Sequence, residues 1–510
     1  MSSTLPSSCA NALPTITWTE ADQPCTAFWH SERGAPAPKR VVLADDTMNA
    51  DTAYRLACEG VGLLWQGDFQ NARMLVQALA RRTDRLPERQ QFKANKQSAR
   101  LAVKRLSQTV STTPVPATHG ATEAQIHPEG SSPVTSNPAT SSPHSASTAH
   151  TRAAEAFHHH RLIQSQRARV LGMVLLPLDE AYQITLRRAP DVQAACAEVW
   201  GALDVATAAK AQDRLLAHQQ AAGLKAKPSD DPADQPFIET FDEPGKPAKL
   251  SKFEQKIIKE AKGVVTHITS LRELLGMTST HEWRKKGVEV PALGEVDNRI
   301  HPHYGVFSPV RGEYVALVAK APLPVSAASK ATLIAWDIGT GTGVLAAMLA
   351  RRGLQHIIAT DQDPRALACA RDNVRRLGVE AQVQVVQADL FPPGKAHLIV
   401  CNPPWLPARP GSPIEHAVYD EDSQMLRGFL KGLPAHLAKG GEGWLVLSDI
   451  AEHLGLRTRD ELTAAIEGAG LKVVARLQTK PQHPKALDKS DPLHVARAAE
   501  ITSLWRLAVV

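Results

Sequence analysis

The chain has 510 residues, of which 43% are hydrophobic, 22% are charged and only 5% are aromatic. These proportions exclude a collagen-like, a wholly disordered or a membrane-embedded chain, and the length allows about three to four domains. A net charge of +6 is compatible with a polyanionic partner but does not require one. The six cysteines form no Cys-x-x-Cys pair, which argues against a disulfide framework or a zinc site and favours a reducing compartment.

The sequence shows no signal for membrane insertion or for secretion. The first residues lack the basic and apolar regions of a secretory leader, and the longest apolar stretch, near 170–177, is too short to span a bilayer. We therefore expect a cytoplasmic protein without a membrane partner. Three consecutive histidines at 158–160 do not share a helix face, so we expect no metal site there or elsewhere.

Composition divides the N-terminal half into blocks. Residues 1–110 have the mixed composition of an accessory domain. Residues 111–155 are rich in Ser, Thr and Pro and poor in large aliphatics, which predicts a disordered linker because such a stretch buries too little surface to offset its ordering entropy. A helical accessory region at 156–225, a second linker at 226–250 and a helical connector at 251–299 follow. We expect this region to be mostly helical.

A basic segment lies at the end of the first block. Residues 81–105 include nine basic side chains and only two acidic ones. Phosphate contacts from such a segment would give binding that depends steeply on salt. Phe92 is its only aromatic residue, so a solvated helix face is the slightly better interpretation.

From about residue 300 short β-branched runs alternate with helical runs, which predicts a parallel sheet with crossover helices. One helix has clear ends, because Asp363 can cap it, Pro364 suits its first position and Gly378 can follow its last turn. The last two strands are separated by a long loop rather than a helix, which predicts an antiparallel hairpin. The expected strands are 333–337, 356–361, 383–387, 398–401, 443–447, 471–477 and 503–509.

A glycine-rich turn follows the first of these strands. Its sequence is Asp337-Ile-Gly339-Thr340-Gly341-Thr-Gly343, and its glycines allow a tight turn and a close approach of a ligand to the backbone. Asp361 ends the next strand, where a carboxylate can accept hydrogen bonds from both hydroxyls of a ribose. Asp389 ends the third strand and is placed to contact an adenine amino group. Together these residues predict a nucleoside cofactor.

Two nucleoside cofactors are compatible with a turn of this kind. A dinucleotide site needs Gly-x-Gly-x-x-Gly, but Val344 stands where the third glycine would be, and Asp337 would bring a negative charge near the pyrophosphate. S-adenosylmethionine has no phosphate and carries a cationic amino-acid end. The pattern therefore favours S-adenosylmethionine over a nicotinamide cofactor.

A proline-rich turn, Asn402-Pro403-Pro404-Trp405, follows the fourth strand, which should neighbour the strand of the glycine turn. The side-chain oxygen of Asn402 and the carbonyl of Pro403 can both accept hydrogen bonds from one –NH2 group, and Trp405 offers a flat face for stacking. Hydrogen bonds of this kind localise the lone pair of a planar nitrogen and aim it at a methyl donor, so positioning carries much of the catalysis.

With both turns in place, residues 300–510 resemble class I S-adenosylmethionine-dependent methyltransferases of the small-domain type, which include the glutamine methyltransferases of release factors and several ribosomal RNA base methyltransferases. The resemblance implies a Rossmann-like, doubly wound seven-stranded sheet whose last strand is antiparallel. It implies Asn402, Pro403, Pro404 and Trp405 as the catalytic motif. The cofactor-binding residues that it implies are Asp337, Gly339, Thr340, Gly341, Gly343, Asp361, Gln362, Asp389 and Asn402. We recognise no family in residues 1–250.

The acceptor is less well defined than the cofactor. The glutamine enzymes mostly carry Tyr where this chain has Trp405, and the guanine-directed RNA enzymes mostly carry Phe. Our leading hypothesis is methylation of an exocyclic base amine in RNA or another ribosome-associated substrate. The alternatives are methylation of a glutamine side chain in a translation protein such as a release factor, and a nonenzymatic scaffold that only binds the donor. Arg311 is either a structural ion-pair partner or a group that holds a substrate phosphate.

Overall fold

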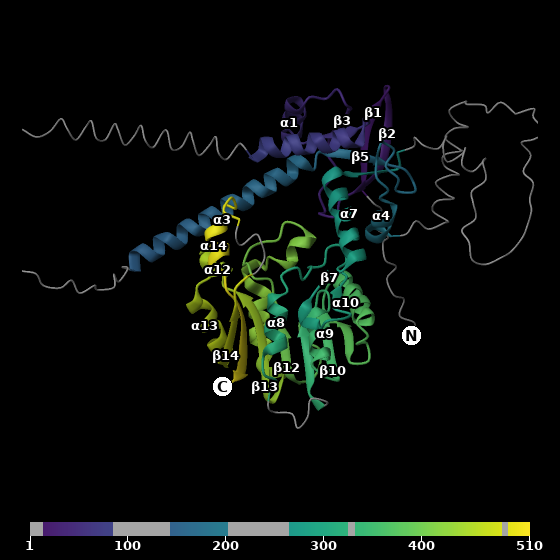
Figure 1. Ribbon diagram of the computed structural model, residues 1–510. Coiled ribbons are helices and arrows are strands. Elements are labelled where there is room, and N and C mark those ends of the chain that lie inside the picture. The colour runs from purple at the N-terminus through teal and green to yellow at the C-terminus, as the bar shows by residue number, and fades with distance from the viewer. Residues whose placement is uncertain (1–13, 85–142, 202–264, 325–331, 482–487) are drawn as a thin grey trace, which may run out of the picture.

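The computed structural model describes residues 14–84, 143–201, 265–324, 332–481 and 488–510. Figure 1 shows two bodies, each built on a large β-sheet, with a six-stranded sheet in the N-terminal half and a seven-stranded sheet in the C-terminal half. Most of the basic segment at 81–105 and most of both predicted linkers lie outside the described residues.

The N-terminal body is organised by a mixed six-stranded sheet in the order β1-β2-β6-β5-β4-β3. Its strands are β1 (Thr15–Glu20), β2 (Gln23–His30), β3 (Arg40–Ala44), β4 (Val61–Trp65), β5 (Val174–Leu178) and β6 (His267–Ser270). The helices around it include α1 (Ala50–Cys58), α3 (Pro143–Leu171), α4 (Gln193–Trp200) and α7 (Leu271–Lys286). Helices are present as expected, but the sheet was not predicted.

This sheet corrects the expected organisation of the N-terminal half. Its strands come from 15–65, from 174–178 and from 267–270, three segments that the composition placed in separate blocks. Strands β4 and β5 are short, wholly buried apolar runs, and such runs cannot be distinguished from buried helix by periodicity. Residues 143–155, expected to be disordered linker, form the first half of α3, consistent with their alanine content.

The C-terminal body confirms the expected fold class. Its sheet has the order β11-β10-β9-β12-β13-β15-β14, with parallel pairing from β11 to β13 and antiparallel pairing on both sides of β15. The strands are β9 (Ile334–Ile338), β10 (His356–Asp361), β11 (Val383–Gln387), β12 (Ala396–Cys401), β13 (Leu437–Ser448), β14 (Leu471–Thr479) and β15 (Thr502–Val509). This is a Rossmann-like sheet with an antiparallel last strand.

Helices cover both faces of this sheet. They are α8 (Glu313–Lys320), α9 (Val344–Arg351), α10 (Pro364–Arg376), α11 (Gln424–His436), α12 (Ile450–His453), α13 (Arg459–Gly468) and α14 (His494–Ala499), the last within the predicted loop. Helix α10 begins and ends as its sequence predicts, because the Asp363 side chain accepts a hydrogen bond from the Arg365 backbone N–H and Gly378 has a left-handed φ of 65°. A short hairpin of β7 (Val288–Glu289) and β8 (Arg299–Ile300) precedes α8.

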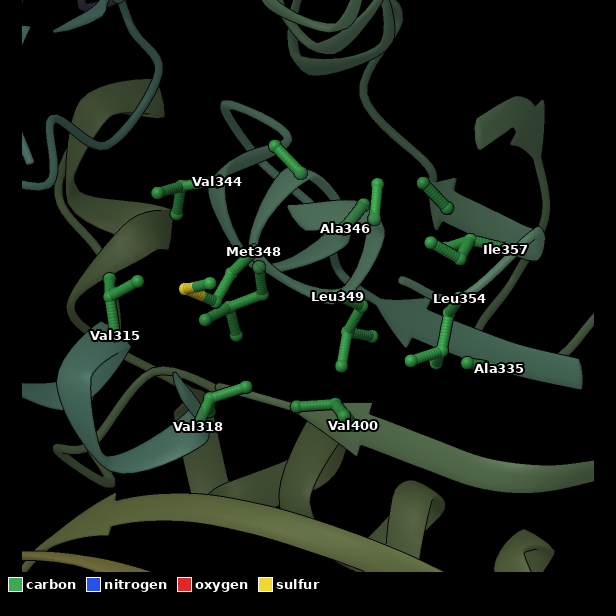
Figure 2. Packing of buried hydrophobic residues seen from close by; sticks show 14 of the residues in the cluster. Val315, Val318, Ala335, Val344, Ala346, Met348, Leu349, Leu354, Ile357 and Val400 are labelled. Carbon is green, nitrogen blue, oxygen red and sulfur yellow. The ribbon is translucent and has the colours of Figure 1, made fainter. Parts of the chain in front are cut away.

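The core on the α9 face fixes the start of the C-terminal body. Figure 2 shows Met348 and Leu349 of α9 packed near Val318 of α8 and Val400 of β12. The same core takes in residues 290 and 293, between the two strands of the short hairpin, and residue 300 of β8. The core of the C-terminal body therefore includes residues up to ten positions before residue 300.

Helices α3 and α7 reach from the N-terminal sheet to the C-terminal body (Figure 1). At the lower end of α7, Arg284 donates to Asp372 of α10 over 3.1 Å. Helix α3 contacts the segment that follows the proline turn, through Phe157 and Arg161. The N-terminal half is thus attached to the C-terminal body on two sides.

Candidate active site

The glycine turn between β9 and α9 adopts a backbone that its glycines make possible. Gly339, Gly341 and Gly343 all have φ between 55° and 80°, in the left-handed region. A side chain at Gly339 would overlap the terminal methyl group of Met425, the second residue of α11. A side chain at Gly341 would meet nothing within 4 Å. The turn is therefore closed against α11 at one end and open at its middle.

Asp337 lies beneath this turn with only 1% of its surface exposed. Its Oδ2 accepts hydrogen bonds from the Thr340 hydroxyl at 2.6 Å and from the Ala346 backbone N–H at 3.0 Å. Among the described residues, no hydrogen bond is made to its Oδ1. Burial raises the pKa of Asp337 to about 6, although both hydrogen bonds act in the opposite direction. One carboxylate oxygen thus stabilises the turn, and the other accepts no hydrogen bond from the described residues.

Asp361 connects the end of β10 to the glycine turn. Its Oδ2 accepts a hydrogen bond from the Gly341 backbone N–H and its Oδ1 accepts one from the Asp363 backbone N–H, both at 3.0 Å. Burial raises the pKa of Asp361 as well. The next residue, Gln362, donates its side-chain amide to the exposed carboxylate of Asp389, which follows β11. The sequence-predicted acids therefore do line the ends of neighbouring strands.

The proline turn lies beside the glycine turn. Strands β12 and β9 are paired in parallel with Cys401 opposite Ile338, so Asn402 and Gly339 follow directly from paired residues. This adjacency is what the order of strands in a doubly wound sheet requires of the two turns. A nitrogen held by Asn402 would consequently lie within a few ångströms of a ligand on the glycine turn.

Trp405 contacts Asn402 in a way that the sequence did not predict. The indole N–H of Trp405 donates a hydrogen bond of 2.9 Å to Oδ1 of Asn402. An amide oxygen has two lone pairs, so Oδ1 retains one for an acceptor –NH2 group. The hydrogen bond from the indole therefore fixes the orientation of the Asn402 amide in the absence of an acceptor.

Arg311 is a site residue whose role the sequence left open. Its guanidinium carbon lies 5.1 Å from the centre of the Trp405 ring, in cation–π contact. The same guanidinium forms ion pairs of 3.0 Å with Glu313 and with the buried Glu500, which also accepts from the Ser448 hydroxyl. Arg311 is therefore an ion-paired support for Trp405. One face of the indole, expected to stack on the acceptor, is covered by this arginine.

Two further features were weighed from the sequence. Among the residues that the structure describes, no three His, Cys, Asp or Glu side chains are grouped to hold a metal ion. In the same residues, no helix has both the length and the apolar character needed to cross a membrane.

Comparison with known proteins finds sequence similarity in the C-terminal body. Residues 297–466 match the family model of the methyltransferase small domain. A release factor glutamine methyltransferase from Cereibacter sphaeroides is 33% identical over 32% of this chain and 58% of its own length. A tRNA1(Val) (adenine(37)-N6)-methyltransferase from Bacteroides thetaiotaomicron is 35% identical over 23% of this chain and 53% of its own length. The chain thus spans little more than half of these relatives.

A crystal structure of a methyltransferase from Pyrococcus furiosus is also similar, with 18% identity, 46% of this chain and 98% of that chain covered, and a TM-score of 0.31. The strand order of the C-terminal body is Rossmann-like, and the sequence matches of this body are to methyltransferases. Residues 297–466 are thus similar to methyltransferase small domains, and the two relatives named above are both methyltransferases.

Proposed function

We propose that this protein is an S-adenosylmethionine-dependent N-methyltransferase that modifies a planar nitrogen, namely an exocyclic base amine in RNA. The observation that carries the proposal is the pairing of β12 with β9, which sets Asn402 beside the glycine turn. That arrangement brings an amine-binding oxygen next to a nucleoside-binding loop. Because the activity belongs to the translation apparatus in this proposal, its site of action is the cytoplasm.

The residues of the glycine turn fit this donor. The open space above Gly341 can admit a ligand against the backbone, and Oδ1 of Asp337 is suited to accept a hydrogen bond from the donor's ammonium group. Asp361 would hold the ribose hydroxyls, with Asp389 and Gln362 near the adenine. When bound, S-adenosylmethionine supplies an electrophilic methyl group on a cationic sulfur, which leaves as a neutral thioether.

The proline turn would orient the acceptor. Oδ1 of Asn402 and the carbonyl oxygen of Pro403 would accept the two N–H bonds of the amine and direct its lone pair at the methyl carbon. These oxygens also stabilise the positive charge that grows on the nitrogen as its bond to carbon forms. The nitrogen then releases one proton to solvent. Burial raises the pKa of the Cys401 thiol well above its usual range, so this neighbour stays protonated and serves as neither base nor nucleophile.

A second acceptor is supported by the relatives. Release factor glutamine methyltransferases are among the matched proteins, and a glutamine side chain also presents a planar –NH2 group. The adenine-directed tRNA enzyme supports an RNA base in the same way. Both acceptors fit the two oxygens of the proline turn. RNA is favoured by the positive net charge of the chain, which suits a polyanion.

The acceptor can be identified by incubating the full-length protein with methyl-labelled donor and a ribosome-rich cell extract. For an RNA acceptor, RNase should release the label while protease leaves it in place, and the reverse result would establish the protein acceptor. Asn402→Ala should lose most transfer while still binding S-adenosylhomocysteine, with at most a small loss of affinity. If neither fraction is labelled while the donor still binds, the protein is a donor-binding scaffold and the proposal is wrong.

A further inference from the structure

The segment that follows the proline turn connects the two halves of the candidate active site. It runs from Trp405 to Met425, the residue whose methyl group touches Gly339 of the glycine turn. Its regular structure is limited to two short 3₁₀ helices and a bridge between Leu406 and Tyr419. Backbone hydrogen bonds join Leu406 to Val418 and Asp420, but the segment has no long helix or strand, so contacts from outside help it to keep one conformation.

Helix α3, from the N-terminal half of the chain, supplies part of these contacts, and α12 and α14 of the C-terminal body supply others. Phe157 is 1% exposed and belongs to the apolar cluster that contains Leu406 and Tyr419. One helical turn later, Arg161 donates to the carbonyl oxygen of Arg409 at 2.7 Å. The contact joins residues 248 positions apart in the sequence, so only the tertiary fold brings them together.

Arg161 contacts three residues of the segment. Besides the Arg409 carbonyl, its guanidinium pairs with Oε2 of Glu415 at 2.9 Å and lies over the ring of Tyr419 at 3.9 Å. Glu415 itself accepts a hydrogen bond from the Gly411 backbone N–H at 2.8 Å. One planar guanidinium therefore contacts the segment at residues 409, 415 and 419.

These contacts differ from an ordinary surface ion pair. The Arg161 side chain is only 23% exposed, and three separate interactions share the cost of fixing it. Arg152, on the same helix, is exposed and makes no hydrogen bond or ion pair among the described residues. The same residue type on the same helix thus provides a matched control.

We propose that Arg161 is a positioning residue for the acceptor side of the active site. Through it, α3 orders residues 405–420, and this is a task for the N-terminal half of the chain that its sequence did not reveal. The expected effect of Arg161 on turnover rests on the proposed function. The expected effect of Arg161 on the order of residues 405–420 does not depend on any activity.

The first test is hydrogen exchange on full-length Arg161→Ala, Arg161→Lys and Arg152→Ala. Peptides that cover 405–420 should exchange about tenfold faster in Arg161→Ala, because charge-assisted contacts that hold the segment closed are lost. Arg161→Lys should fall between this variant and the wild type, since lysine keeps the charge but not the planar fork. Arg152→Ala should match the wild type. Unchanged exchange in 405–420, or a rise spread evenly over the whole chain, would overturn the inference.

The second test separates acceptor from donor. For Arg161→Ala we expect the KM for the acceptor to rise about tenfold, while S-adenosylhomocysteine binds within about twofold of the wild-type affinity. An equal loss of donor affinity would contradict a role on the acceptor side. If the wild-type protein transfers no methyl group but exchange in 405–420 still responds to Arg161→Ala, the proposed function fails and the positioning role stands.

Discussion

Replacing Asp337 by Asn should stabilise the ligand-free protein and at the same time weaken donor binding. The carboxyl group is buried, and burial raises its pKa from an ordinary value of 3.8 to about 6. Ionising a group at pH 7 against such a shift costs about 3 kcal/mol of folding free energy, at 1.36 kcal/mol per pKa unit. An amide carries no charge and avoids this cost, while its oxygen can still accept from Thr340 and Ala346.

The sign of the pH dependence follows from the raised pKa. Between about pH 4 and pH 6 the folded protein binds the Asp337 proton more tightly than the unfolded chain does, so the stability that this group provides is lost as the pH rises through that window. The advantage of Asp337→Asn should therefore be near zero at pH 4 and reach about 1 to 3 kcal/mol at pH 7, after allowance for weaker hydrogen bonds to an amide.

Donor binding should show the opposite preference. In the proposed site the donor's ammonium group pairs with an ionised Asp337, so wild-type affinity for S-adenosylhomocysteine should be about tenfold lower at pH 5 than at pH 7. Asp337→Asn should bind at least about tenfold more weakly at pH 7, since the loss of a charge-assisted hydrogen bond is worth this much. Asp361 titrates in both proteins, so the difference between their pH profiles isolates Asp337.

Chemical denaturation at pH 4.5 and pH 7, with calorimetry at pH 5 to 8, measures both effects. Asp22→Asn, an exposed carboxyl in the turn between β1 and β2, is the control and should change neither. The reasoning is refuted if Asp337→Asn is less stable than the wild type at pH 7 while still folded, or if it binds S-adenosylhomocysteine as tightly.

Three other substitutions test separate parts of the domain. Gly339→Ala places a methyl group against α11 at a φ of 69°, so donor affinity measured by calorimetry should fall by about tenfold or more. Trp405→Phe removes the indole N–H that orients the catalytic amide, and kcat should fall about three- to tenfold with donor affinity unchanged; an unaltered kcat would show that the bond has no catalytic role. Arg506→Ala leaves the carboxylate of Glu442 buried without its bidentate partner and should lower the free energy of unfolding by about 3 kcal/mol, whereas Lys472→Ala on the exposed edge strand should change it by less than about 0.5 kcal/mol.

The sequence determined the C-terminal fold because its signals are local. Each strand of that sheet is bounded by its own turn or helix cap, as in Asp363-Pro364 before α10 and Gly378 after it. Strands that alternate with helices favour a parallel sheet, and the ends of neighbouring parallel strands then share one edge. The proximity of the glycine and proline turns followed from this rule.

The N-terminal sheet was decided by contacts that no local pattern records. Strands β4 and β5 are separated by more than a hundred residues, yet Leu63 pairs with Val174 in the parallel register. Five consecutive buried residues satisfy a strand and a helix equally well, so burial alone did not specify the pairing. The strand pairing is selected only by the tertiary packing of the whole chain.

The sequence by itself determined which groups would meet at the candidate active site, and the tertiary structure decided how they face. Asp361 and Asn402 could be placed from strand ends alone, whereas the indole hydrogen bond to Asn402 and the grip of Arg161 on residues 409–419 depend on side-chain directions set by distant elements. The physical reason is that a backbone pattern fixes position along a strand, but a side chain turns toward whichever partner the packed fold brings within reach.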